Sequence, residues 1–278
     1  MRLFLPVLLI LALLIASAGQ AAPTRATSER SADNTRFDGK TVSQWLQQLR
    51  TDDADRWHEA ANALMMNGDQ AVGPLTKALD DKDARVRRGA AQGLRQLTVF
   101  PPHTLAALRK HLQDPSLLVR ADVCETLAYA NDDMVPVVAA VRSVLASDDP
   151  ATREAVLYVF HLIPLDEEPC LNLVFDALKH KDPSVRVEAA EALDHQKNLS
   201  AEVAGPLRLA LGDPDVRVRV AAASSYWTST GDPAPLPGLL VETLRSAPMA
   251  GSRAAAAGVL AQMGERAKDK FAAIATAA

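Results

Sequence analysis

The stretch LKHKDPSVRVEAAEAL, residues 178–193, contains the pattern that decides the fold. Val185, Ala189 and Leu193 are spaced i, i+4 and i+8, which places their side chains on one face of a helix. The Asp-Pro dipeptide before them supplies a capping carboxylate and a residue that is favoured in the first helical turn. The stretch therefore predicts a turn followed by an amphipathic helix.

The same pattern recurs along the chain at a nearly constant spacing. Residues 79–94 read LDDKDARVRRGAAQGL, residues 112–127 read LQDPSLLVRADVCETL and residues 211–226 read LGDPDVRVRVAAASSY. The leading leucine recurs after 30 residues once and then after 33 residues five times, at Leu49, Leu79, Leu112, Leu145, Leu178, Leu211 and Leu244. A fixed period of this length is typical of solenoids, in which repeats stack on their neighbours without one central core.

Each repeat is predicted to contain two helices, a helix A that ends near the leading leucine and a helix B that carries the apolar stripe. Thr41 or Ser43 is expected to cap the first helix A. Residues 265–278 resemble a helix A that lacks its partner, and we interpret them as a C-terminal cap. The expected fold is all-α, a superhelix of about seven antiparallel helix pairs plus a C-terminal half-repeat.

The four quoted stretches resemble the HEAT repeat, and specifically its phycobilisome-lyase HEAT-like variety. The shared motif is a leucine, an Asp/Pro turn, Val-Arg, then Ala-Ala and a large apolar residue, and the resemblance covers residues 41–278. It implies an armadillo-like α-solenoid with the B helices on the concave side. Repeats of this kind serve many unrelated functions, so the resemblance predicts the fold and leaves the function open.

Residues 1–21 have the features of a signal peptide. Arg2 precedes an apolar run over residues 3–15, and small residues suited to cleavage follow it. The run is short for a membrane span, which needs about 20 residues, so we expect cleavage, with retention as an anchor as the alternative. This leader predicts a periplasmic or secreted protein.

The rest of the chain divides into two parts. Residues 22–36 are polar, without apolar periodicity, and are predicted to be a disordered linker. Residues 37–278 are expected to form the repeat domain. Loss of Arg2 with the leader leaves 29 of the 30 basic residues against 34 acidic ones, a net charge of −5. This charge gives no attraction to nucleic acid or to anionic lipid, so neither is expected as a partner.

The two cysteines, Cys124 and Cys170, are predicted to stay unpaired although export permits a disulfide. They belong to repeats that are two steps apart in the stack, on the order of 20 Å. A disulfide requires Cα atoms within about 7 Å.

An arginine follows the leading leucine by eight residues in five repeats, and we call these five residues the arginine ladder: Arg87, Arg120, Arg153, Arg186 and Arg219. Aspartates lie in the turns before them: Asp83, Asp114, Asp149, Asp182 and Asp215. Because the arrangement repeats, we interpret it as structural, each arginine reaching turn acids of an adjoining repeat as in resembling proteins. An anion-binding ridge is the alternative.

His58-Glu59 is the motif most suggestive of metal chemistry. Deoxyhypusine hydroxylase, a HEAT-like enzyme, holds two irons with His-Glu pairs on several helices, and such ligands suit iron. The corresponding positions of the other repeats are not His-Glu pairs, so no metal, cofactor or catalytic residue is predicted. No G-x-S-x-G, phosphate-binding loop or H-E-x-x-H motif is present in the sequence.

Aromatic and imidazole side chains gather near the ends of successive B helices, and we call this set the aromatic row: Tyr129, Tyr158, His161, His195 and Trp227. Tyr and Trp are enriched at protein interfaces. The row is therefore a candidate contact surface for a protein or peptide partner, and packing between repeats is the alternative interpretation.

These features together favour an exported, non-catalytic scaffold that binds another protein or peptide. One alternative is an enzyme or enzyme accessory, bilin lyase-like or hydroxylase-like. Another is the stalk of a larger complex, with no binding face of its own.

Overall fold

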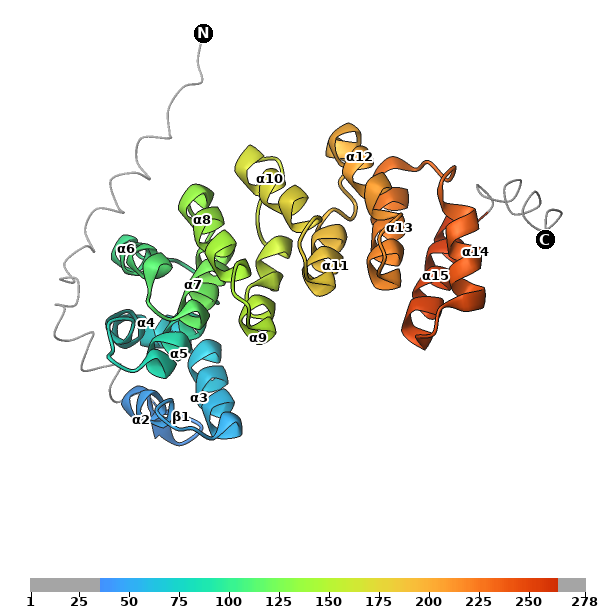
Figure 1. The fold of residues 1–278 in the computed structure, drawn as a ribbon. Coiled ribbons are helices and arrows are strands. Elements are labelled where there is room, and N and C mark those ends of the chain that lie inside the picture. Colours follow the sequence, from blue (N-terminus) through green and yellow to red (C-terminus); the bar gives the residue numbers. More distant parts are fainter. Residues whose placement is uncertain (1–35, 265–278) are drawn as a thin grey trace, which may run out of the picture.

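The computed structural model describes residues 36–264, which form seven antiparallel helix pairs (Figure 1). The A helices are α2 (Val42–Gln48), α4 (Gly68–Ala78), α6 (Pro102–Lys110, continued by the 3-10 turn η1, His111–Gln113), α8 (Met134–Leu145), α10 (Glu168–Ala177), α12 (Ser200–Ala210, preceded by η3, Lys197–Leu199) and α14 (Leu236–Ser246). The B helices are α3 (Ala54–Met66), α5 (Ala84–Leu94), α7 (Leu117–Tyr129), α9 (Pro150–Glu154) with η2 (Leu157–His161), α11 (Pro183–Ala192), α13 (Val216–Thr230) and α15 (Ala250–Met263). We number the pairs as repeats 1 to 7, and the predicted all-α solenoid is confirmed.

The predicted signal peptide, most of the linker and the C-terminal half-repeat lie outside the described residues. Arg36, predicted to be the last linker residue, is instead part of strand β1 (Arg36–Phe37), which pairs antiparallel with β2 (Lys40–Thr41). The Trp45 indole donates a hydrogen bond of 3.0 Å to the Phe37 carbonyl, which fastens this hairpin to α2. Thr41 caps α2, as predicted, in a reciprocal capping box with Gln44.

Aspartate caps begin many of the B helices. The carboxylates of Asp83, Asp149, Asp182 and Asp215 each accept a hydrogen bond from a backbone amide of the first turn that follows. Each cap satisfies an amide that has no partner within its helix, a contribution of about 1 kcal/mol. The Asp/Pro turns of the sequence are therefore helix starts.

The core runs along the whole array between the two layers of helices. The leading leucines are fully buried in the first two repeats and remain largely buried through repeat 5. The large apolar residue late in helix B is also buried, as at Leu94, Leu127, Phe160 and Leu193. Gly68 is required by close packing of α4 on α5, because a Cβ there would lie 2.3 Å from the Gly93 carbonyl oxygen.

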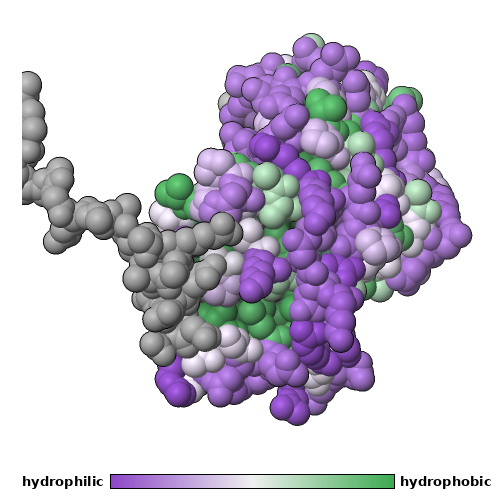
Figure 2. Space-filling view, turned by 90° about the vertical axis from the view of Figure 1, so that its left-hand side faces the viewer, coloured by the Kyte–Doolittle hydropathy of each residue, from purple (hydrophilic) through white to green (hydrophobic). Residues whose placement is uncertain are grey.

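The repeats stack into an arc (Figure 1). The A helices α6, α8, α10 and α12 lie along its outer edge, and the B helices line its inner, concave side. Viewed from the N-terminal end, the visible surface is mostly hydrophilic, with apolar residues in the hollows (Figure 2). Among residues 36–264, no helix is both long enough and apolar enough to cross a membrane.

Helix B of repeat 4 differs from the other B helices, and the sequence did not predict this. It ends as an α-helix at Glu154 and continues after a break as the 3-10 segment η2, Leu157–His161. The segment around the break contains Val156, Tyr158, Val159 and Phe160, β-branched and aromatic residues that lose side-chain freedom in an α-helix. The break carries His161 toward the next repeat.

Candidate functional site

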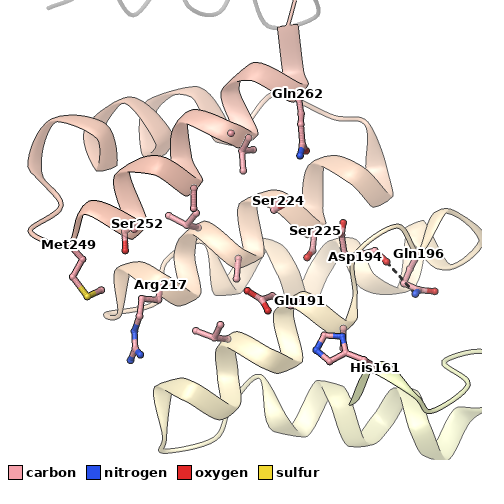
Figure 3. A pocket seen from close by; sticks show the side chains of 18 residues that line it. His161, Glu191, Asp194, Gln196, Arg217, Ser224, Ser225, Met249, Ser252 and Gln262 are labelled. Carbon is pink, nitrogen blue, oxygen red and sulfur yellow. Dashed lines mark hydrogen bonds between the residues drawn. The ribbon is translucent and has the colours of Figure 1, made fainter. Parts of the chain in front are cut away.

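The concave side opens into a cavity of about 1040 Å³, which we call the main cavity, lined by residues of η2, α11, α13 and α15. Val187, Val220 and Val259 provide apolar surface, while Glu191 and Arg217 provide charge (Figure 3). An apolar lining with a few convergent polar groups is the usual composition of a binding site.

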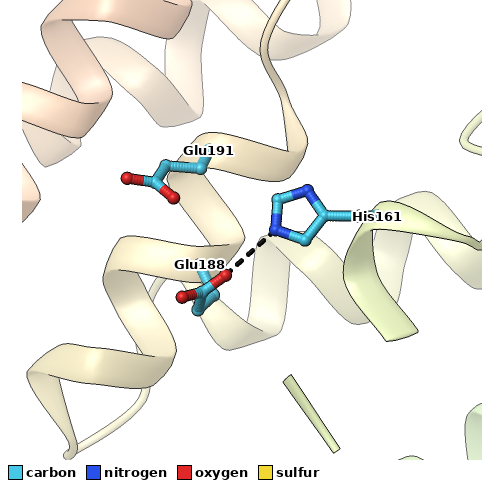
Figure 4. Close-up of side chains that lie close together, drawn as sticks. All are labelled: His161, Glu188 and Glu191. Carbon is cyan, nitrogen blue, oxygen red and sulfur yellow. Dashed lines mark hydrogen bonds and ion pairs between the residues drawn. The ribbon is translucent and has the colours of Figure 1, made fainter. Parts of the chain in front are cut away.

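Three side chains that could ligate a metal ion converge at the edge of this cavity: His161, Glu188 and Glu191 (Figure 4). Glu188 and Glu191 are three residues apart on α11 and so share a helix face. His161 Nε2 lies 3.0 Å from Glu188 Oε2, and one ligand atom from each residue lies within 4.8 Å of the others. Glu191 is exposed by surface area, but partial desolvation of its carboxyl raises its pKa, and repulsion from Glu188 adds to the effect.

The same two positions of helix B are acidic in repeat 3, where Asp122 and Glu125 lie on α7. There the preceding repeat supplies the counter-charge. Arg88 Nε donates to Asp122 Oδ2 over 2.8 Å, Gln92 Nε2 donates to Asp122 Oδ1 over 2.7 Å, and Arg95 forms an ion pair with Glu125. We call Asp122 and Glu125 the repeat-3 pair, and Glu188 and Glu191 the repeat-5 pair.

The donors of repeat 2 are absent from the matching positions of repeat 4. Two periods of 33 residues after Arg88, Gln92 and Arg95, the chain has Glu154, Tyr158 and His161. Within residues 36–264, His161 is the only residue recorded in an ion pair with the repeat-5 pair. Arg217 lines the main cavity but is paired with Asp215 over 2.8 Å. The repeat-5 pair thus keeps an excess of negative charge on the concave side.

A second cavity, of about 630 Å³, lies between repeats 4 and 5 and adjoins the same cluster. Its lining includes Glu154, Tyr158, His161 and Glu188. His161 also lines the main cavity, so the imidazole stands between the two spaces.

The arginine ladder makes two kinds of contact. In their own repeats the arginines bond turn carbonyls, as when Arg186 Nη1 donates to the His180 carbonyl over 2.8 Å. Three of them also form ion pairs with the next repeat: Arg87 with Asp114, Arg153 with Asp182 and Arg186 with Asp213. Burial opposes ionisation of Asp213, but hydrogen bonds from Arg186 and the Asp215 amide outweigh it and lower the pKa.

The structure differs from the predicted ladder at several positions. Arg120 and Arg219 form no recorded ion pair within residues 36–264, and Arg219 bonds the Asp213 and Pro214 carbonyls. Asp83, Asp149 and Asp215 cap helices instead of pairing with the ladder, because each lies at the N-terminus of helix B with its carboxylate turned to the backbone amides. Asp114 and Asp182, which are predicted ladder acids, do bind arginines of the preceding repeat, whereas Arg186 is bound by Asp213, two residues before the predicted Asp215.

The aromatic row does not form one continuous surface. Tyr129 and Tyr158 are exposed, at 50% and 53%. His161 belongs to the acidic cluster, and His195 lies beyond the end of α11 in a left-handed backbone conformation with φ of 58°. Trp227 on α13 is only 8% exposed because its side chain belongs to the hydrophobic core, and this contradicts its assignment as a contact residue.

Within residues 36–264, the His58-Glu59 motif and the two cysteines make contacts only within their own repeats or the core. Glu59 accepts hydrogen bonds from Gln48 and Lys40, and His58 Nδ1 lies 2.7 Å from the Ala54 carbonyl oxygen. Cys124 and Cys170 are buried and recorded as free thiols. Burial raises the pKa of the Cys170 thiol to about 11, so it is a poor nucleophile at neutral pH.

The repeat-5 pair was not singled out from the sequence. The signal was present, because alignment of the repeats places Asp122 above Glu188 and Glu125 above Glu191. The two pairs differ only in the donors that the preceding repeats supply, and these lie about 30 residues earlier in the chain.

Comparison with known proteins agrees with this architecture. A family model for HEAT repeats matches residues 42–128, which comprise most of the first three repeats. The chain is a HEAT-repeat protein. The match is to HEAT repeats in general, and the phycobilisome-lyase variety expected from the motif is not confirmed. No curated protein matches the sequence.

Solved HEAT-like structures resemble this HEAT-repeat protein with low sequence identity. The Escherichia coli protein YibA superposes with a TM-score of 0.57 and 18% identity, covering 89% of this chain and 88% of YibA. A chain of the Pds5–Scc1 complex has a TM-score of 0.44 and 13% identity, covering 84% of this chain and 41% of its own length. Human deoxyhypusine hydroxylase has a TM-score of 0.32 and 17% identity, over 80% and 95% of the two chains. At such identities the likeness to YibA shows the fold alone.

Proposed function

We propose that this HEAT-repeat protein is an exported, non-catalytic scaffold that binds a protein or peptide segment along its concave side. The observation that carries the proposal is the main cavity, which extends over four successive repeats, 4 to 7, and combines valine side chains with separate polar groups. A solenoid presents an extended surface of this kind, and an extended polypeptide can follow it from repeat to repeat.

Export is proposed from the leader. The apolar run at residues 3–15 with small residues after it has the length and order of a cleavable signal. Mass spectrometry of the protein from the exported fraction should find an N-terminus near residue 22. Recovery of the intact chain from the cytoplasm would contradict export.

Binding on the concave side can be tested by filling the main cavity. Ala255 is exposed on α15 and lines that cavity, so Ala255→Trp should block it without disturbing the core. Ala201 is exposed on α12, in the outer layer, and Ala201→Trp is the matched control. Partners recovered with the wild-type protein should be lost with Ala255→Trp and retained with Ala201→Trp. Equal recovery with both variants would contradict binding in this cavity.

The exposed tyrosines offer a second test. Tyr129→Ala should weaken partner binding by about 1–2 kcal/mol if Tyr129 is a contact residue. Its side chain is half exposed, so the free energy of unfolding should change by less than about 0.5 kcal/mol. Unchanged affinity would remove Tyr129 from the contact surface.

A further inference from the structure

The repeat-5 pair lacks the counter-charge that the repeat-3 pair receives. Asp122 and Glu125 are bound by Arg88, Gln92 and Arg95, whereas the matching positions before Glu188 and Glu191 are Glu154, Tyr158 and His161. Two of the three cationic or amide donors are thus replaced by an acid and a phenol, and the third by an imidazole. An imidazole beside two carboxylates is a set of metal ligands as well as a weak ion pair.

We propose that His161, Glu188 and Glu191 bind a divalent transition-metal cation, for which Zn²⁺ is the appropriate probe. Nitrogen and oxygen donors of this kind bind Zn²⁺ at about 2.0–2.2 Å. The proposal concerns a site that the chain forms by itself, so it does not depend on the proposed partner binding.

The geometry suits such an ion after a small movement. Ligand atoms in a tetrahedral site at these bond lengths are separated by roughly 3.3 Å. His161 Nε2 and Glu188 Oε2 are already 3.0 Å apart, and suitable atoms of all three residues lie within 4.8 Å of one another. Within residues 36–264 no hydrogen bond or ion pair is recorded for the Glu191 carboxylate, and Glu191 is exposed, so rotation of this side chain can complete the site.

The surroundings add to the attraction for a cation. Glu154 lines the smaller cavity together with His161 and Glu188. The nearby arginines are already bound to carboxylates, Arg153 to Asp182 and Arg217 to Asp215. Three protein ligands leave a fourth position of a tetrahedral ion open. Because His161 and Glu191 both line the main cavity, that position is available to water or to an added donor group.

Calorimetric titration of the metal-stripped protein with Zn²⁺ tests the proposal. We expect one saturable site per chain, which His161→Ala and Glu191→Gln each weaken by about tenfold or more. His161→Arg should abolish binding, because it gives repeat 4 the arginine that repeat 2 has at Arg95.

His195→Ala is the matched control, since His195 is an exposed histidine beside a carboxylate, Asp194, outside the cluster. Its affinity for Zn²⁺ should equal that of the wild type. All four substitutions are at exposed or half-exposed positions, and circular dichroism should show that each variant folds. A Kd of about 1 mM or weaker, binding that survives His161→Ala, or binding lost in His195→Ala would each overturn the proposal.

Discussion

Repeats 3 and 5 carry acidic side chains at the same two positions of helix B. The repeats before them place different side chains next to these acids. Repeat 2 places two arginines and a glutamine on the repeat-3 pair, while repeat 4 places a histidine, a tyrosine and a glutamate near the repeat-5 pair. The first arrangement is closed, because its charges are neutralised within the array. The second is open to the concave side and to any cation that reaches it.

The difference shows how a repeat protein can separate structure from function. A solenoid is stabilised by its nearest-neighbour interfaces, so a change in one interface leaves the others intact. Here the broken helix B of repeat 4 brings His161 to the edge of the main cavity without changing the arginine ladder on either side. The open pair costs some local stability, which is common at binding sites.

The largest expected effect concerns the core beneath α13, the helix of repeat 6 that lines the main cavity. Trp227 is buried on α13, so Trp227→Ala should lower the free energy of unfolding by about 3–5 kcal/mol. Urea titration followed by circular dichroism measures this loss. A loss below about 1 kcal/mol would mean that Trp227 is a surface residue after all.

The next largest effect on the free energy of unfolding is expected from the ion pairs between repeats. They stabilise the stack that holds both acidic pairs. Arg186 binds Asp213 through two nitrogens at 2.7 and 2.8 Å, and both side chains are largely buried, so Arg186→Ala should cost about 2–3 kcal/mol. Arg219→Ala is the control, because Arg219 bonds carbonyls without a recorded acid partner and should cost about 1 kcal/mol. Equal losses in the two variants would show that the ion pair adds nothing.

A smaller effect appears in the pH dependence of stability, with opposite signs for Asp213 and Glu191. The pKa of Asp213 is lowered from 3.8, so its stabilisation is full above that value and is lost as the pH falls below it. The pKa of Glu191 is raised from 4.5, so its ionisation reduces stability as the pH rises above 4.5. Unfolding measured between pH 3 and pH 7 should therefore show a smaller acid-side decline in Asp213→Asn and a smaller decline above pH 4.5 in Glu191→Gln than in the wild type. Curves parallel to the wild type would contradict both assignments.

Much of the fold followed from the sequence because the interactions that define a repeat are local. The leading leucine recurs every 33 residues, an Asp cap begins helix B in repeats 2, 4, 5 and 6, and a valine precedes four of the five ladder arginines. Each of these residues determines a helix end or a helix face. The break in helix B of repeat 4 did not follow, because the residues around Val156 are compatible with either a helical turn or a 3-10 turn, and packing decides between them.

The candidate site was harder to predict from the sequence than the fold, because it depends on packing between repeats. Trp227 and His161 occupy the same position relative to the ladder arginine, yet Trp227 is buried on a regular helix and His161 is turned outward on η2. The charge balance of Glu188 and Glu191 depends on side chains about 30 residues earlier, which no pattern within one helix reveals.

The most direct measurement compares two single substitutions at one position of the repeat, Glu125→Gln in repeat 3 and Glu191→Gln in repeat 5. Glu125→Gln leaves Arg95 without its ion-pair partner and should lower the free energy of unfolding by about 1–3 kcal/mol. Glu191→Gln removes repulsion from Glu188 and should raise it by up to about 0.5 kcal/mol in metal-free buffer at pH 7. Opposite signs in urea titrations are the predicted result, and a loss of similar size in both variants would contradict the distinction between a closed and an open acidic pair.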